Sequence, residues 1–187
     1  MLPKDIDPIT FEVIRNAFDS LVDEMALTVM RTAQSGVVKD AMDYATVFCD
    51  REGRIIAQGV TVVLMANVFP DAMTAVLDRY ADDINPGDVF IANDPYGSGG
   101  SHLPDVYIMR PIFIDEQLEG FSGVTAHQAD IGGLVPGSNS TNSTEIYQEG
   151  LRIPTVKLYG RGVPSETMFD LIEHNVRVPK TVLGDMR

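Results

Sequence analysis

The sequence predicts an α+β fold in which a long N-terminal helix precedes a mixed or largely antiparallel sheet, with a metal site on loops at strand ends. Apolar residues recur at helical spacing near the N-terminus, whereas β-rich runs separated by turn residues fill the middle of the chain. With 187 residues and 44% hydrophobic content, the chain can bury a core. We therefore expect residues 1–187 to form a single domain.

The first element is the helix. Asp7 is a typical N-cap, and Pro8 follows it at the first helical position, where a missing N–H costs nothing. The apolar residues that then repeat at helical spacing are Phe11, Ile14, Phe18, Leu21, Val22, Met25 and Val29. This spacing predicts an amphipathic helix ending near Gly36.

Three short strands and a second helix are expected next. Ala45–Phe48 and Arg54–Gln58 are strand-like, and the turn residues between them indicate a hairpin. From Asn67 to Tyr80 apolar residues step by four, which predicts a second helix. After the breaker Asn85-Pro86-Gly87-Asp88, Val89–Ala92 reads as a strand.

The second half begins with two β-rich segments, Val106–Ile114 and Gly120–Ala126. The charged turn 115–117 separates them, so we expect them to pair antiparallel. Residues 136–144 form a polar loop without periodicity, long enough to cover a cleft. A final helix is predicted over Ser165–Val176, with Ser165 as its cap.

A candidate metal site lies around this predicted hairpin. His102 and His127 are each followed three residues later by an aspartate, Asp105 and Asp130 respectively. The hairpin would place the residues before its first strand near those after its second, which brings His102 and Asp105 close to His127. Two imidazoles and one carboxylate make a three-ligand site with open positions, as a catalytic metal requires.

Other readings of these residues stay open. A lone histidine is more often a hydrogen-bonded structural residue than a ligand. Asp130 is either the partner that holds the ring of His127 or a turn residue before two glycines. His174 lies in a polar stretch and is not followed by an aspartate three residues later. The single cysteine, Cys49, lies in a strand of alternating pattern, which favours a buried structural thiol.

Charge and composition exclude several partners. The formal net charge of −13 disfavours nucleic acid and anionic membranes, because their phosphates would be repelled. The N-terminal sequence MLPKDIDPIT lacks the features of a secretory signal, and no apolar run is long enough to span a bilayer. We expect a cytoplasmic protein that neither binds nucleic acid nor inserts into a membrane.

Four stretches resemble the hydantoinase B/5-oxoprolinase family, whose relatives include the large subunits of acetone and acetophenone carboxylases. They are DAMDYATVFCDREGRIIAQG, NDPYGSGGSHLPD, AHQADIGGLVPGS and EIYQEGLRIPTVKLY, and the resemblance extends over nearly the whole chain. Family members are considerably longer. The resemblance thus implies that this chain is the N-terminal portion of such a subunit.

The resemblance also implies a cofactor and a partner. In the acetone carboxylase relatives a divalent metal is held at positions matching His102, Asp105 and His127, and we expect one ion, manganese or zinc. The implied partner is a hydantoinase A-like subunit that uses ATP to phosphorylate a small-molecule substrate, so a hetero-oligomer is expected. Asp130 and Glu149 are then candidate catalytic residues that would orient or deprotonate water.

Three functions remain open at this point. The first is hydrolysis of a cyclic amide after ATP-dependent activation, as in N-methylhydantoinase B and 5-oxoprolinase. The second is ATP-dependent carboxylation of a ketone, which is favoured by Gln128, where many hydrolytic members carry a second histidine, and by Asp94, where oxoprolinases often carry histidine. The third is a non-catalytic structural subunit.

Overall fold

A single antiparallel sheet organises the structure, a computed structural model that describes residues 6–187. Its strand order is β2-β1-β5-β4-β3-β6-β7. Every neighbouring pair is antiparallel, which confirms the predicted fold class. The strands are β1 (Tyr44–Asp50), β2 (Ile55–Gln58), β3 (Val89–Ala92), β4 (Asp105–Ile114), β5 (Gln117–His127), β6 (Val156–Gly160) and β7 (Val163–Pro164).

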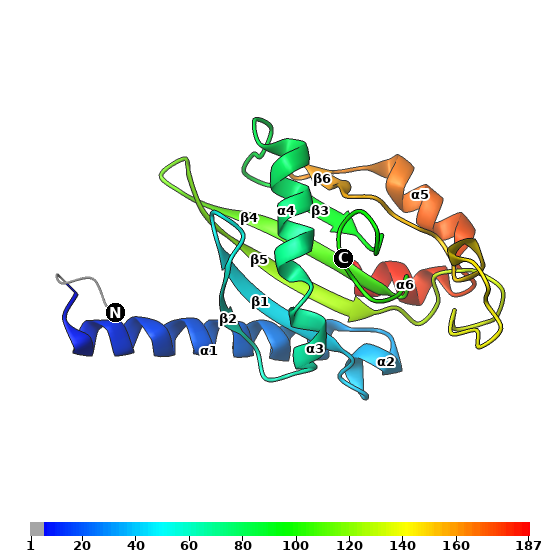
Figure 1. The fold of residues 1–187 in the computed structure, drawn as a ribbon, viewed down its shortest axis with the longest axis horizontal. Coiled ribbons are helices and arrows are strands. Elements are labelled where there is room, and N and C mark those ends of the chain that lie inside the picture. The colour runs from blue at the N-terminus through cyan, green and yellow to red at the C-terminus, as the bar shows by residue number, and fades with distance from the viewer. Residues whose placement is uncertain (1–5) are drawn as a thin grey trace.

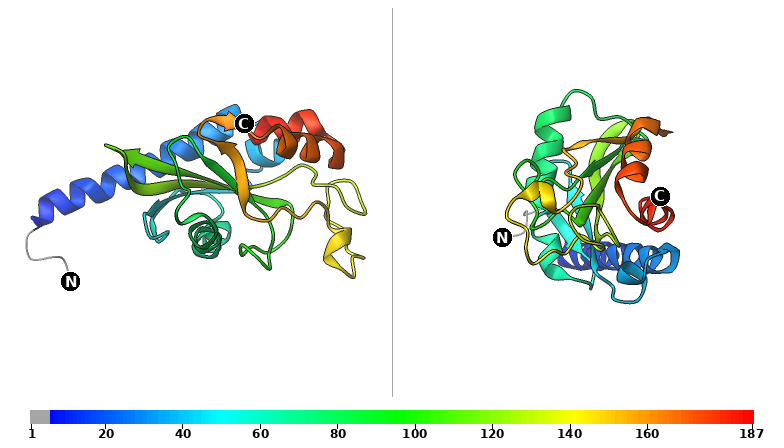
Figure 2. Two further views of the ribbon diagram at one scale, coloured as in Figure 1. Left: turned by 90° about the horizontal axis from the view of Figure 1, so that it is seen from above. Right: turned by 90° about the vertical axis from the view of Figure 1, so that its right-hand side faces the viewer.

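Helices cover both faces of this sheet. They are α1 (Pro8–Thr32), α2 (Gly36–Lys39), α3 (Val63–Ala66), α4 (Phe69–Tyr80), α5 (Glu166–Asn175) and α6 (Pro179–Asp185), with a short 3₁₀ helix η1 (Ile146–Gln148). Helix α4 crosses one face, whereas α1, α5 and α6 lie on the other (Figures 1 and 2). None of the described helices is both long and apolar enough to cross a membrane.

Strand β1 is buried on both faces because its side chains alternate between the two helical layers. Tyr44 and Thr46 point towards α1, where their hydroxyls donate to helix carbonyls at 2.7 and 2.9 Å. Val47 and Cys49 point the other way, into the cluster under α4. Cys49 is a buried thiol, as the strand pattern predicts, and burial raises its pKa to about 12.

Helix α1 ends at Thr32, so the predicted end near Gly36 is wrong. Ser35 instead caps the separate helix α2, accepting from its backbone at 3.3 Å. The carboxylate of Asp185, at the far end of the chain, accepts from the backbone N–H groups of Gln34 and Ser35 at 2.6 and 3.2 Å. These contacts hold the break between the two helices.

The remaining elements differ from prediction mainly at their ends. Asp7 caps α1 as expected, accepting from the N–H of Thr10 at 3.1 Å. Ser165 occupies the N-cap position of α5 as predicted, but its side chain makes no capping bond; its backbone carbonyl accepts from the N–H groups of Met168 and Phe169 instead. The short elements α3, β6, β7 and α6 were not predicted, because none is long enough to show a period.

The β4–β5 hairpin is the element that positions the site. Its turn is tighter than predicted: Asp115 and Glu116 both adopt positive φ, at 48° and 65°, and Gln117 already belongs to β5. A β-bulge between Ile112 and Phe113 shifts the register between this turn and the open end of the hairpin, where Asp105 pairs with His127.

Candidate metal centre

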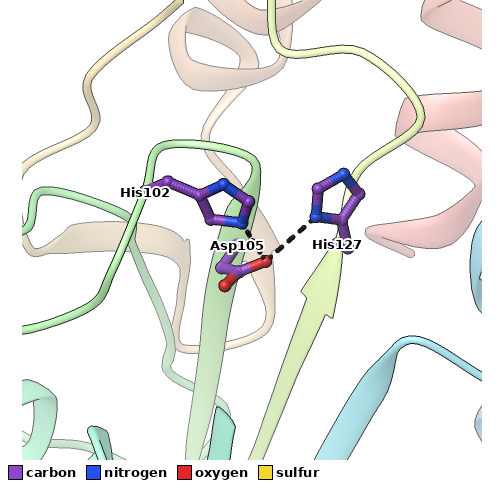
Figure 3. A group of neighbouring side chains, drawn as sticks. All are labelled: His102, Asp105 and His127. Carbon is purple, nitrogen blue, oxygen red and sulfur yellow. Dashed lines mark hydrogen bonds and ion pairs between the residues drawn. The ribbon is translucent and has the colours of Figure 1, made fainter. Parts of the chain in front are cut away.

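The three predicted ligands converge at the open end of the β4–β5 hairpin. Asp105 is the first residue of β4, His127 is the last residue of β5, and His102 lies in the loop before β4 (Figure 3). Oδ1 of Asp105 lies 2.9 Å from Nε2 of His102 and 3.2 Å from Nδ1 of His127. One donor atom from each residue lies within 4.8 Å of the other two.

Two local features bring these side chains together. Asp105 and His127 face each other directly in the ladder, and opposite residues of an antiparallel pair have Cβ atoms about 5 Å apart. The loop carrying His102 turns back through Gly99 and Gly100, which adopt φ values of 73° and 109°. A Cβ at Gly99 would lie 2.7 Å from the Cβ of Asp71, so glycine is required by both conformation and space.

The cluster is electrostatically coupled. Burial of Asp105, which is 6% exposed, would raise the pKa of its carboxyl, but hydrogen bonds to His102 and His127 together with their charges outweigh burial and lower it to about 2. The same bond to Asp105 raises the pKa of His102, against the opposing effect of burial. The carboxylate is therefore ionised at neutral pH and available as a ligand.

The donor set fits a divalent metal ion. With metal–donor distances of about 2.1 Å, adjacent ligands of a tetrahedral or octahedral ion lie about 3.0–3.4 Å apart. The two nitrogen–oxygen separations of 2.9 and 3.2 Å match such edges. Two imidazole nitrogens and one carboxylate oxygen suit zinc or manganese and leave coordination positions open.

The sequence match extends over almost the whole chain. A sequence profile described as hydantoinase B/oxoprolinase matches residues 7–187. The chain belongs to the hydantoinase B/oxoprolinase family. The resemblance inferred from the four motifs is therefore confirmed.

Named relatives within the family include two pseudomonad proteins. The B-type chain of a putative D-/L-hydantoinase from Pseudomonas sp. (strain NS671) is 33% identical over 188 residues, which is 98% of this chain and 32% of that protein. The beta chain of caprolactamase from Pseudomonas jessenii is 36% identical over 181 residues, which is 97% of this chain and 31% of that protein. This chain thus spans about one third of the length of these relatives.

Solved structures share the fold. The crystal structure of ATP-dependent caprolactamase from P. jessenii superposes with a TM-score of 0.90 at 36% identity, over 98% of this chain and 31% of the other. A nucleotide-free acetone carboxylase structure also gives a TM-score of 0.90, but at 19% identity, over 98% of this chain and 24% of the other. The latter likeness is evidence of a common fold only.

Two residues that the sequence pattern did not reveal lie next to His127. Nδ2 of Asn139 is 3.3 Å from Nε2 of the ring, and Oδ2 of Asp43 is 4.0 Å from Nδ1. The backbone carbonyl of Asp43 also accepts from the N–H of His127 at 3.0 Å. The signal for Asp43 was its place just before a strand that pairs with β5, whereas Asn139 lies in an aperiodic loop that gives no signal.

Asp130 does not reach His127 through any hydrogen bond among the described residues. Its carboxylate accepts from the backbone N–H groups of Gly132, Gly137 and Arg177 at 2.9, 3.1 and 2.9 Å. The guanidinium of Arg177 adds an ion pair at 2.9 Å. Of the two roles considered for Asp130, the turn role is the one that these contacts favour, and a catalytic role for it stays a prediction.

The other two candidates differ in their distance from the cluster. Glu149 follows η1 and is half-buried, and its charge contributes to the raised pKa of His102. Its role as a base stays a prediction. His174 is exposed on α5, with Nδ1 2.8 Å from the carbonyl oxygen of Asp170, and it does not belong to the cluster.

Proposed function

We propose that this chain is the N-terminal domain of a metal-dependent, hydantoinase B-type subunit that opens a cyclic amide after ATP-dependent activation by a partner. The observation that carries the proposal is the convergence of His102, Asp105 and His127 into an N/N/O donor set with open positions. The family membership and the 33–36% identity to proteins named for hydantoinase and caprolactamase support the hydrolytic reading. We place the protein in the cytoplasm.

Metal binding and proton transfer would fall to different residues. A single manganese or zinc ion held by His102, Asp105 and His127 would supply Lewis acidity towards a substrate carbonyl and towards water. Asp105 neutralises part of the positive charge, and its low pKa keeps it ionised throughout the neutral range. The charge of Glu149 contributes to the raised pKa of His102, and we assign Glu149 as the base that accepts a proton from water.

Activation requires a second subunit. Amide resonance resists attack by water, and the sequence contains no Gly-x-x-x-x-Gly-Lys-Ser/Thr motif that would bind ATP phosphates. The two pseudomonad relatives carry the B and beta designations of multi-subunit enzymes. We propose a hydantoinase A-like ATP-binding partner, docked against the end of α1 that projects beyond the sheet and exposes Ile9, Val13 and Ile14 (Figure 1).

The second candidate is a ketone carboxylase subunit, which would use the same metal site to stabilise an enolate. Gln128 and Asp94 favour it by their resemblance to carboxylase-like members. Gln128 is buried and donates to the carbonyl of Ala126 at 3.1 Å, so it takes no ligand position in the cluster of His127.

The decisive assay reconstitutes the full-length subunit with its ATP-binding partner. We expect ATP-dependent opening of a hydantoin, 5-oxoproline or a lactam, and no turnover by the 187-residue chain alone. Product from ketones plus bicarbonate would select the carboxylase reading instead. Elemental analysis tests the structural-subunit reading, which a stoichiometric divalent ion would reject. ATP-dependent turnover by the isolated chain would contradict the division of labour between subunits.

A further inference from the structure

We propose that Asn139 is a positioning residue for the metal centre, whose side-chain amide holds the ring of His127 with Nδ1 directed at the site. The inference rests on the proposed metal site and names a residue beyond its three ligands. It depends on the contacts of the ring, on the way the loop 130–139 is built, and on the chemistry of an amide.

Both nitrogens of the His127 ring are engaged. Nδ1 lies 3.2 Å from Oδ1 of Asp105, and Nε2, on the opposite side, lies 3.3 Å from Nδ2 of Asn139. The His127 side chain is only 12% exposed, so Asn139 occupies the solvent side of an otherwise enclosed ring. A ring contacted at both nitrogens cannot rotate without losing one contact.

The loop that delivers Asn139 is rigidly constructed. The Arg177 guanidinium pairs with Asp130 and donates to the carbonyl oxygens of Gly132, Gly133 and Val135 at 3.2, 2.6 and 3.1 Å. These contacts tie the end of α5 to the segment immediately before Asn139. The position of Asn139 is therefore set by a network, although its own side chain is exposed.

The residue just before Asn139 is held in an uncommon conformation. Ser138 is buried and has a φ of 60°, in the left-handed region that non-glycine residues seldom adopt. Its hydroxyl accepts from the N–H of Ile131 at 2.8 Å and donates to the carbonyl of Gly132 at 2.7 Å. Such conformations persist only where the surroundings fix them, and they concentrate at functional sites.

An amide can complement either neutral form of the ring. With the Asn139 amide nitrogen turned towards Nε2, the matching tautomer of His127 carries its proton on Nδ1, which then donates to Asp105. When Nδ1 binds a cation, it gives up its proton to solvent and Nε2 takes one from water, so the ring stays neutral. A half-turn of the amide then presents Oδ1 as acceptor for Nε2–H. This is the support that metal-bound histidines usually receive from a neighbouring acceptor.

The test compares Zn²⁺ and Mn²⁺ binding by the purified 187-residue chain, at about pH 8 where imidazole is ordinarily neutral, for wild type, Asn139→Leu, Asn139→Asp and Asn142→Leu. Asn139→Leu should weaken binding about 10- to 100-fold, as the loss of an outer partner does. Asn139→Asp keeps the acceptor and should bind about as tightly as wild type. Asn142 is an exposed residue of the same loop, so Asn142→Leu should change nothing.

A second readout separates positioning from packing. In the Zn²⁺-loaded chain with ¹⁵N-labelled histidine, the Nε2–H of His127 should be protected from solvent exchange in wild type and Asn139→Asp, but exchange freely in Asn139→Leu. Equal affinities for wild type and Asn139→Leu would overturn the inference. Equal losses in Asn139→Leu and Asn139→Asp would overturn it too, by indicating packing alone. No binding by wild type would instead refute the metal site itself.

Discussion

Alanine replacement of each proposed ligand should remove most of the bound metal, and the size of the loss can be worked from the structure. Zinc sites with four protein ligands bind with about 10–16 kcal/mol, or about 2.5–4 kcal/mol per ligand, which corresponds to about 100- to 1,000-fold in affinity. The side chain of His102 is 35% exposed, and those of His127 and Asp105 are 12% and 9% exposed. Water can replace a lost ligand most readily at His102.

We therefore expect the loss for His102→Ala to lie at the lower end of this range, and the losses for His127→Ala and Asp105→Ala at the upper end. His174→Ala is the matched control, because it removes an exposed imidazole that has no place in the cluster. Isothermal titration with Mn²⁺ or Zn²⁺ measures the dissociation constants. Thermal unfolding provides an independent check, since an ion at about 100 times its dissociation constant stabilises the folded state by about 2.7 kcal/mol.

The reasoning would be refuted if His174→Ala stripped the metal while His127→Ala retained it. Unchanged binding in all four variants would also contradict it, since that pattern would indicate nonspecific binding to an acidic surface rather than a site. The fold of each variant is checked by circular dichroism, so that loss of metal is not confused with unfolding.

Three further predictions concern the framework that holds the site. Asp88→Ala should destabilise the protein by about 3 kcal/mol in chemical denaturation, because it leaves Lys157 without its fully buried partner at 2.9 Å. Asp83→Ala removes the exposed partner of the same lysine and should cost much less; equal losses would contradict this difference. Gly123→Ala should cost about 1–3 kcal/mol, because a Cβ would overlap the side chains of Phe69 and Val47, while Gly160→Ala, with open space around it, should be near neutral. Burial would raise the pKa of Asp130, but hydrogen bonds from Arg177 outweigh it and lower that pKa. The stabilisation from these bonds is therefore present above the ordinary carboxyl pKa of about 3.9 and disappears as pH falls through the lower pKa of the folded state. Arg177→Met should reduce stability at neutral pH and weaken its dependence on pH in the acid range, and an unchanged pH profile of stability would argue against the Arg177–Asp130 ion pair.

Patterns within short stretches of the sequence determined much of the fold. Helical periodicity and the Asp7 cap predicted α1, alternation predicted β1, and a turn between two β-rich runs predicted the β4–β5 hairpin. Because an antiparallel hairpin fixes which residues meet at its open end, the sequence also predicted that His102 and Asp105 approach His127. These inferences succeeded because each depends on neighbours along the chain.

Only the tertiary structure decided the contacts between distant segments. Asp185 holds the break between α1 and α2 from about 150 positions away along the sequence, and Arg177 holds Asp130 across 47 positions. Asn139 reaches His127 from a loop without periodicity. No residue spacing encodes such pairs, since they arise when packed helices bring α5 and α6 against the strand ends. The convergence of the three proposed ligands could thus be predicted from the sequence, whereas the contacts that distant residues make around them could not.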